Sequence, residues 1–141
     1  MKEFEGKVAV VTGASGGIGR ASALAFAMKG AKVVVADVQV GQGSETVKMI
    51  EETGGEAVFV RTDVANSTDV QALIGKTVER FGRLDYAINN AGIGGVNAPT
   101  AEYPEEEWDR IIGINLSGVW FCMKYEIPEM LKQGKGAIVN T

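Results

Sequence analysis

The chain has 141 residues, of which 45% are hydrophobic and 23% charged, and its net charge is −4. This length suits a single domain that can bury a sizeable core. The acidic balance lacks the basic surface that grips a phosphate backbone, so we expect no nucleic-acid partner. No apolar run approaches the roughly 20 residues that a membrane-spanning helix needs. Because Glu3 and Glu5 stand where a signal peptide has basic and then apolar residues, we expect a cytoplasmic protein that does not bind membranes.

The chain lacks the residue types of several common catalytic and metal sites. It has no histidine, and Cys122 is its only cysteine. This excludes Ser-His-Asp and Cys-His nucleophilic sites, zinc sites built from histidine or cysteine, and a disulfide within the chain. Cys122 lies among aromatic residues and methionines in a helical stretch, which favours a small buried hydrophobic residue. We expect no metal site.

Short apolar runs alternate with helical patterns along the chain. Four runs rich in Val, Ile, Phe and Ala predict strands at 7–12, 32–37, 56–61 and 84–89. They are apolar almost throughout, as is typical of parallel strands covered on both faces. Their starts lie 25, 24 and 28 residues apart, the spacing of strand–helix–strand units. The pattern predicts one α/β domain over residues 1–141, with a doubly wound parallel sheet.

The segments between these strands show helical periodicity. Glycines follow the helices where a left-handed cap is wanted, at Gly30, Gly54 and Gly82. Two sets of residues each fall on one helical face and predict the sides that pack on the sheet: Ile18, Ala21, Leu24, Ala25 and Met28 in the first, and Val70, Leu73, Ile74, Val78 and Phe81 in the second.

A longer helical pattern runs from Pro104 to about Lys132. Proline at its start, followed by the carboxylates of 105–107, is a favourable first helical turn, so we interpret this acidic run as a helix start rather than a metal or substrate site. Pro128 is expected to kink the helix near its end. The predicted apolar face is Trp108, Ile111, Ile112, Asn115, Leu116, Val119 and Met123.

The first strand runs into the sequence TGASGGIG, with glycines at 13, 17 and 19. Glycine lets the backbone approach a pyrophosphate closely, and the following helix presents free N–H groups and the positive end of its dipole. A glycine-rich turn alone is weak evidence, but its place between a first strand and an amphipathic helix favours a dinucleotide site. The spacing is not that of a G-x-G-x-x-G motif, because Ser22 stands where that motif ends in Gly or Ala. It is not a P-loop either, since no Lys-Ser or Lys-Thr pair follows.

Asp37 ends the second strand, 18 residues after Gly19. Dinucleotide sites place an acid about 20 residues beyond the glycine turn, where it accepts hydrogen bonds from the adenosine ribose. Such a carboxylate would repel a 2′-phosphate, and no Lys or Arg stands beside it or inside the turn. We therefore expect NAD to be preferred over NADP. The alternative is that Asp37 serves as a turn or helix-capping aspartate.

Further polar residues stand near the predicted strand ends. Asp63 follows the third strand and Asn90 follows the fourth, and ligands of open α/β sheets bind at the carboxyl ends of the strands. Asn115 interrupts an apolar helix face and must find a hydrogen-bond partner there. It could also cap an irregularity in the helix.

Together these motifs resemble the short-chain dehydrogenase/reductase family over the whole length of the chain. Thr12, Gly13, Gly17 and Gly19 fit its T-G-x-x-x-G-x-G turn, Asp63–Val64 resembles its adenine-contacting segment, and NNAG at 89–92 matches its cofactor-lining motif. The resemblance implies a Rossmann-type sheet of strand order 3-2-1-4-5, a nicotinamide cofactor, and hydride transfer between a small-molecule alcohol and a carbonyl compound. It also implies a homo-oligomer, a dimer or tetramer, with the long helix in the interface, although the same apolar face could instead be core.

The same resemblance implies a role for each matching residue. Asn115 matches the helix asparagine that joins a catalytic tetrad through an ordered water. The expected cofactor contacts are Gly13, Ser15, Gly17, Ile18 and Gly19 for the pyrophosphate, Asp37 for the ribose, Asp63 and Val64 for the adenine, and Asn90, Ala91 and Gly92 for the cofactor floor.

In that family the strand GAIVNT, at 136–141, leads to the catalytic serine and then to a Tyr-x-x-x-Lys pair. Neither is present here, so we expect the chain to be the cofactor-binding half of a longer enzyme, inactive by itself, with its last strand an uncovered edge. One alternative is a non-catalytic dinucleotide-binding or assembly fragment. Another is an NAD-dependent sugar epimerase of the related extended family, which the glycine spacing fits less well.

Overall fold

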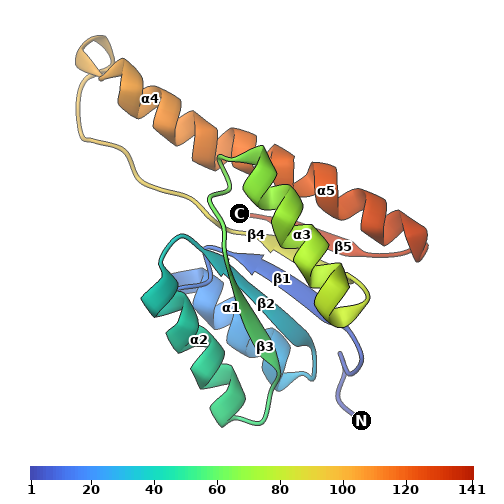
Figure 1. Ribbon diagram of the computed structural model, residues 1–141. Helices are drawn as coiled ribbons and strands as arrows, with labels where there is room; N and C mark the ends of the chain where they lie inside the picture. Colours follow the sequence, from blue (N-terminus) through green and yellow to red (C-terminus); the bar gives the residue numbers. More distant parts are fainter.

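The computed structural model describes residues 1–141 and contains one five-stranded sheet of order β3-β2-β1-β4-β5 (Figure 1). All four strand pairs are parallel. The predicted fold class and strand order are confirmed, and each predicted strand is shortened by at most two residues at its start. The strands are β1 Val8–Thr12, β2 Lys32–Asp37, β3 Ala57–Arg61, β4 Tyr86–Asn89 and β5 Ala137–Asn140.

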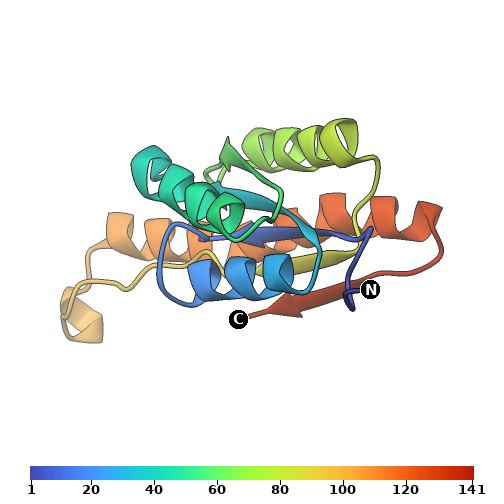
Figure 2. The same ribbon diagram turned by 90° about the horizontal axis from the view of Figure 1, so that it is seen from below.

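Helices cover both faces of the sheet (Figures 1 and 2). Helices α1 and α2 pack together on one face, and α3 and α5 pack together on the other. A short 3₁₀ helix precedes α4, and a π-helical segment joins α4 to α5. None of these helices has the length and apolarity to cross a bilayer. The bounds are α1 Gly17–Met28, α2 Val40–Glu52, α3 Ser67–Phe81, η1 Thr100–Glu102, α4 Glu105–Ile112, η2 Gly113–Ser117 and α5 Gly118–Lys132.

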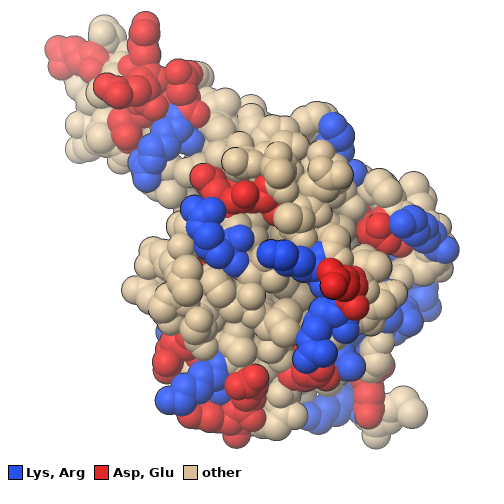
Figure 3. Space-filling view, viewed as in Figure 1, with Lys and Arg blue, Asp and Glu red and all other residues tan.

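Helix α4 projects beyond the edge of the sheet (Figure 1). Acidic side chains gather at this end (Figure 3), where the first turn of α4 carries Glu105, Glu106 and Glu107. Helix α4 begins at Glu105, one residue later than predicted, and Pro104 is its N-cap residue. The carboxylates therefore lie near the positive end of the helix dipole, which is a stabilising position.

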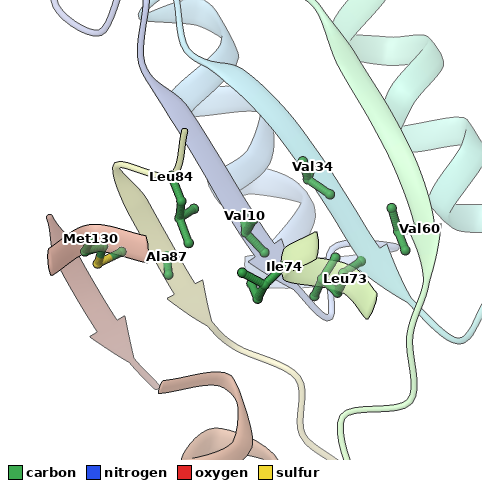
Figure 4. Packing of buried hydrophobic residues seen from close by; sticks show 9 residues of the cluster. Val10, Val34, Val60, Leu73, Ile74, Leu84, Ala87 and Met130 are labelled. Carbon is green, nitrogen blue, oxygen red and sulfur yellow. The ribbon is translucent and has the colours of Figure 1, made fainter. Parts of the chain in front are cut away.

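Strand β1 is the centre of the fold, and all five of its residues are buried. Its alternate side chains point to opposite faces. Val10 joins the core beneath α3 and α5 with Leu73, Ile74 and Met130 (Figure 4). Val11 joins the core beneath α1 and α2. Burial on both faces explains why the strand runs are apolar throughout instead of alternating.

The predicted packing face of α1 is largely wrong, whereas that of α3 is confirmed. Ile18 and Met28 are 70% and 67% exposed. The buried residues of α1 are instead Gly19, Ala23 and Ala27, which are spaced four apart. Because α1 lies close to the sheet, small side chains occupy the fully buried positions, while Leu24 of the predicted face is partly buried and packs against the same core.

The predicted apolar face of the long helix does not form part of this chain's core. Trp108 and Leu116 are 61% and 63% exposed. The buried row of α5 is Gly118, Cys122, Glu126 and Met130, so Cys122 is a core residue as expected. The π-helical segment shifts the helical phase, so one helical period does not describe the whole of 104–132. Pro128 lies inside α5, which continues to Lys132.

A buried carboxylate fixes the start of β4 to the start of β1. Asp85 is 3% exposed and accepts hydrogen bonds from the Val8 N–H at 2.9 Å and from Arg83 Nε and Nη2 at 2.8 and 2.6 Å. Burial alone raises the pKa of Asp85. The hydrogen bonds from Arg83 and Val8, with the charges of Arg83 and Lys7, outweigh that effect and leave the pKa below its ordinary value.

Replacing Asp85 by alanine should destabilise the fold by about 1–3 kcal/mol, because the buried Val8 N–H would lose its acceptor. Since the folded-state pKa of Asp85 is lowered, its contribution is present above pH 3.8 and lost as the pH falls further. Denaturant unfolding of both forms at several pH values measures this. The control Glu52→Ala, which breaks an exposed pair with Lys48, should change stability by less than about 0.5 kcal/mol. An equal loss in the two variants would contradict the assignment.

Candidate functional site

A cavity of about 480 Å³ opens at the carboxyl edge of the sheet. The ends of β1, β2, β3 and β4 contribute to it, because parallel strands all finish at the same edge. Among the sequence-predicted residues it is lined by Gly13, Ser15, Ile18, Asp37, Asp63, Val64, Asn90, Ala91 and Gly92. Gly17, Gly19 and Asn115 do not line it.

The turn between β1 and α1 forms one wall of the cavity. Gly13 and Gly17 have φ of +64° and +52°, a region that favours glycine. A Cβ on Gly19 would overlap the carbonyl oxygen of Gly13 and lie 2.7 Å from Asn90 Nδ2. No side chain caps the start of α1 and no acid lies in its first turn, so its N–H groups are open to an anion.

Asp37 lies where β2 ends and contacts both the glycine turn and the next helix. Its Oδ2 accepts hydrogen bonds from the Ser15 N–H at 3.2 Å and from Ser15 Oγ at 2.7 Å. Its Oδ1 accepts from the Gln39 N–H at 3.0 Å. The alternative interpretation, a turn aspartate, is therefore realised in the structure. Each carboxylate oxygen can accept more than one hydrogen bond, so capacity for a ligand hydroxyl remains.

The charge around the cavity is negative. Asp37 and Asp63 are its charged lining residues, and no lysine or arginine lines it. Arg20, the cation nearest the glycine turn in sequence, is held by α2: its Nε donates to Thr46 Oγ1 at 2.9 Å and its Nη2 to the Gln42 carbonyl at 3.0 Å. A phosphate bound here would therefore interact with the helix dipole and with backbone N–H groups, but with no positively charged side chain.

Thr12 joins the ends of β1 and β4 beneath the cavity. Its Oγ1 accepts hydrogen bonds from the N–H groups of Asn90 and Ala91, both at 3.0 Å. Asn90 Nδ2 donates to the Thr12 and Gly13 carbonyls at 3.2 and 3.4 Å. These bonds hold the asparagine side chain against the glycine turn, so that the two walls of the cavity are fixed relative to each other.

At the third strand end, Asp63 and Val64 point in different directions. Asp63 Oδ1 accepts from the Ala65 N–H at 3.0 Å and shapes the turn that leads to α3. Val64 is 6% exposed and packs with Val70 and Cys122. Its side chain is therefore mostly core, although part of the residue reaches the cavity.

Asn115 lies in the π-helical segment and clamps the chain that leaves β4. Its Oδ1 accepts from the Ile93 N–H and its Nδ2 donates to the Ile93 carbonyl, both at 2.9 Å. As expected for an asparagine on an apolar helix face, Asn115 is hydrogen-bonded, and it also lies at a helix irregularity. The paired bonds leave Ile93, a lining residue, fixed beside the cavity.

Several lining residues escaped the sequence analysis. Most of them stand next to a predicted residue in the chain, which is the only signal that could have indicated them; Gln39 and Gln42 lie further along, at the start of α2. These residues are Gly16, Val38, Gln39, Gln42, Thr62, Ile93 and Ile114.

An open parallel sheet with a glycine turn after its first strand and a cavity at its carboxyl edge defines a Rossmann-type α/β protein. The family model for short chain dehydrogenases matches residues 7–141. The chain belongs to this family of oxidoreductases, as its motifs suggest.

Similar proteins of known sequence or structure belong to the same family. A short chain dehydrogenase/reductase of Aspergillus oryzae is 49% identical over 139 residues, which cover 97% of this chain and 53% of the relative. Cyclohexanol dehydrogenase of an Acinetobacter species is 42% identical over 99% of this chain and 55% of its own length. A short chain dehydrogenase/reductase from Burkholderia phymatum, solved in complex with NAD, is 42% identical with a TM-score of 0.94 over 99% of this chain and 50% of that one. The chain spans about half the length of the curated relatives it matches.

The close packing at Gly19 predicts that Gly19→Ala lowers the free energy of unfolding by about 1–3 kcal/mol, since the added methyl group has no room. Gly75→Ala is the matched control: a Cβ there meets nothing within 4 Å, in the interior of α3. That variant should gain roughly 0.5–1 kcal/mol of stability through helix propensity. Chemical denaturation of the two variants tests the contrast, and a tolerated Gly19→Ala would refute the close approach.

Proposed function

We propose that the cavity binds NAD and that the whole protein is an NAD-dependent oxidoreductase, interconverting an alcohol and a ketone or aldehyde by hydride transfer. The observation that carries this proposal is the position of the glycine turn and Asp37 on adjacent walls of one cavity at the carboxyl edge. The NAD complex of the Burkholderia phymatum relative and the name of the Acinetobacter cyclohexanol dehydrogenase support it.

In this proposal each wall holds one part of the cofactor. The pyrophosphate lies against the N-terminus of α1 and the turn, where Gly17 and Gly19 shape the backbone and Gly13, Ser15 and Ile18 line the cavity. Asp37 accepts hydrogen bonds from the adenosine ribose, and the adenine lies beside Asp63 and Val64. Asn90, Ala91 and Gly92 form the floor near the nicotinamide. Bound NAD supplies the hydride acceptor, while these residues orient it.

The charge of the lining favours NAD over NADP. A 2′-phosphate would lie beside the Asp37 carboxylate without a lysine or arginine among the lining residues to compensate it. Arg20, whose guanidinium is bonded to α2, is not placed to do so.

Removing the proton of the substrate hydroxyl requires a general base, and residues 1–141 do not contain the Tyr-x-x-x-Lys pair that the family uses for this. No tyrosine of the chain has a lysine four residues later. We propose that Asn115 positions the segment at Ile93, and that the general acid/base belongs to sequence beyond this chain. Residues 1–141 alone should then bind NAD without oxidising an alcohol, as a dinucleotide-binding fragment would.

Asp37→Ala should weaken NAD binding roughly ten- to hundred-fold, the effect of losing a charged hydrogen-bond acceptor, and should reduce the preference over NADP. Isothermal titration with each dinucleotide measures both effects. Asp37→Asn keeps an acceptor for Gln39 but removes the charge, so it should relax the preference with less damage to the turn. The control Glu45→Ala, on exposed α2 surface, should bind as the wild type does. Unchanged affinities for NAD and NADP in both Asp37 variants would rule out the ribose role.

We also propose that the whole protein is a homo-oligomer that buries the exposed apolar residues of α4, the π-helical segment and α5. Trp108, Leu116 and Trp120 are 61%, 63% and 54% exposed. Such a patch is typical of a protein interface. Double substitution of Leu116 and Trp120 by glutamate should shift the sedimentation coefficient of the whole protein toward that of a smaller species. Val40→Glu, at a 54% exposed residue of α2, should leave it unchanged; equal sedimentation of all three forms would argue against this interface.

A further inference from the structure

A carboxyl group is buried where α5 crosses the end of β4. Glu126 is 1% exposed and Asn89 is 2% exposed. Asn89 Nδ2 donates to Glu126 Oε1 at 2.7 Å and to Asn140 Oδ1 at 3.0 Å. The amide therefore bridges α5, β4 and β5. No lysine or arginine forms an ion pair with Glu126.

Two atoms of this cluster lack a partner, and they belong to the same two side chains. Glu126 Oε2 and Asn89 Oδ1 are the buried side-chain atoms without a hydrogen bond. With an ionised carboxylate both would be acceptors, so neither could satisfy the other. A proton on Oε2 changes this, because it supplies the donor that Asn89 Oδ1 lacks. A carboxylic acid and a carboxamide can then pair through two parallel hydrogen bonds.

We propose that Glu126 is a positioning residue that acts as a neutral carboxylic acid, donating from Oε2 to Asn89 Oδ1 while Oε1 accepts from Asn89 Nδ2. The paired side chains fix the carboxyl ends of β4 and β5. Asn89 immediately precedes Asn90, and Asn140 precedes Thr141, whose Oγ1 donates to Asn90 Oδ1 at 3.3 Å. The protonation of Glu126 stands independently of the cofactor, whereas its effect on NAD affinity rests on the proposed function.

The surroundings of Glu126 favour the protonated form. Burial raises its pKa to about 7, although the hydrogen bond from Asn89 opposes the shift. On α5, one turn before Glu126, burial raises the pKa of the Cys122 thiol to about 12, so it is uncharged. One turn after it, Glu129 pairs with Lys132 at 2.9 Å. Strand β4 contributes Asn89, and β5 reaches the same amide through Asn140. Where α3 packs on α5, the hydroxyls of Ser67 and Tyr125 pair at 3.1 Å.

The sign of the pH effect follows from the raised pKa. The ordinary value is 4.5, and the folded value is about 7. Between these values the unfolded chain has lost the proton and the folded protein keeps it, so folding stability falls as the pH rises through this window. Above it, both states are ionised and the contribution of Glu126 stays constant.

Glu126→Gln is the matched variant, because its amide supplies a permanent donor to Asn89 Oδ1 at nearly the same size. We expect the wild-type protein to lose stability between pH 4.5 and about 7 relative to this variant, in denaturant unfolding across pH. Infrared difference spectra of the two forms at pH 6 should show a carboxylic-acid carbonyl band that the glutamine variant lacks. If the stabilities of the two forms change with pH in the same way, or if that band is absent, Glu126 is not a neutral acid.

The positioning role is tested by NAD titration at pH 6. Glu126→Gln should bind as the wild type does, whereas Glu126→Leu, which leaves Asn89 unpaired, should bind roughly tenfold more weakly, the effect of one hydrogen bond at the strand end. Equal affinity of the leucine variant and the wild type would overturn positioning. If the leucine variant does not fold, NAD affinity is compared above pH 7 instead. Weaker binding by the wild type but not by the glutamine variant would support the positioning role, and equal binding by both would overturn it. A wild type that binds no NAD would refute the proposed function, while the infrared band would still decide the state of Glu126.

Discussion

The parallel pairing of β1 with β2 on one side and β4 on the other is the constraint on which the remaining structure depends. It buries β1 completely and brings the carboxyl ends of neighbouring strands to one edge. The chain must leave each strand at that edge through a turn, and parallel connections return over the faces as helices. Loops from distant parts of the sequence therefore surround a single cavity without any strand having to be distorted.

Close approach at this edge has a steric requirement and a polar one. The turn after β1 passes so near to Gly19 and Asn90 that only hydrogen fits at residue 19. The backbone groups brought together there need partners, and Thr12 and Asn90 provide them. These residues fix the cavity walls by contacts within the protein. A ligand can then be bound with little reorganisation, which is how preorganised sites gain affinity.

Three polar side chains tie the outer half of the sheet to the long helix. Asn115 holds Ile93, and the Asn89–Glu126 pair holds the ends of β4 and β5. All lie behind or beside the cavity, so they influence it through the backbone that they position. Because each of them is buried or paired, replacing it with a group that cannot form the same hydrogen bonds should lower stability.

The sequence by itself determined the fold class and the presence of a glycine turn with acids at the strand ends, because apolar runs, spacing and glycine positions are local signals. The strand order came from the family resemblance of its motifs. The sequence failed where the result depends on contacts between elements. The buried face of α1 was predicted only in small part, and residues 104–132 do not follow one helical period. Close packing of α1 on the sheet selects small residues, and the π-helical segment changes the helical phase. The burial of Glu126, for which no prediction was made, was decided only by the tertiary structure: α5 crosses β4 so that this carboxyl group meets Asn89 away from water.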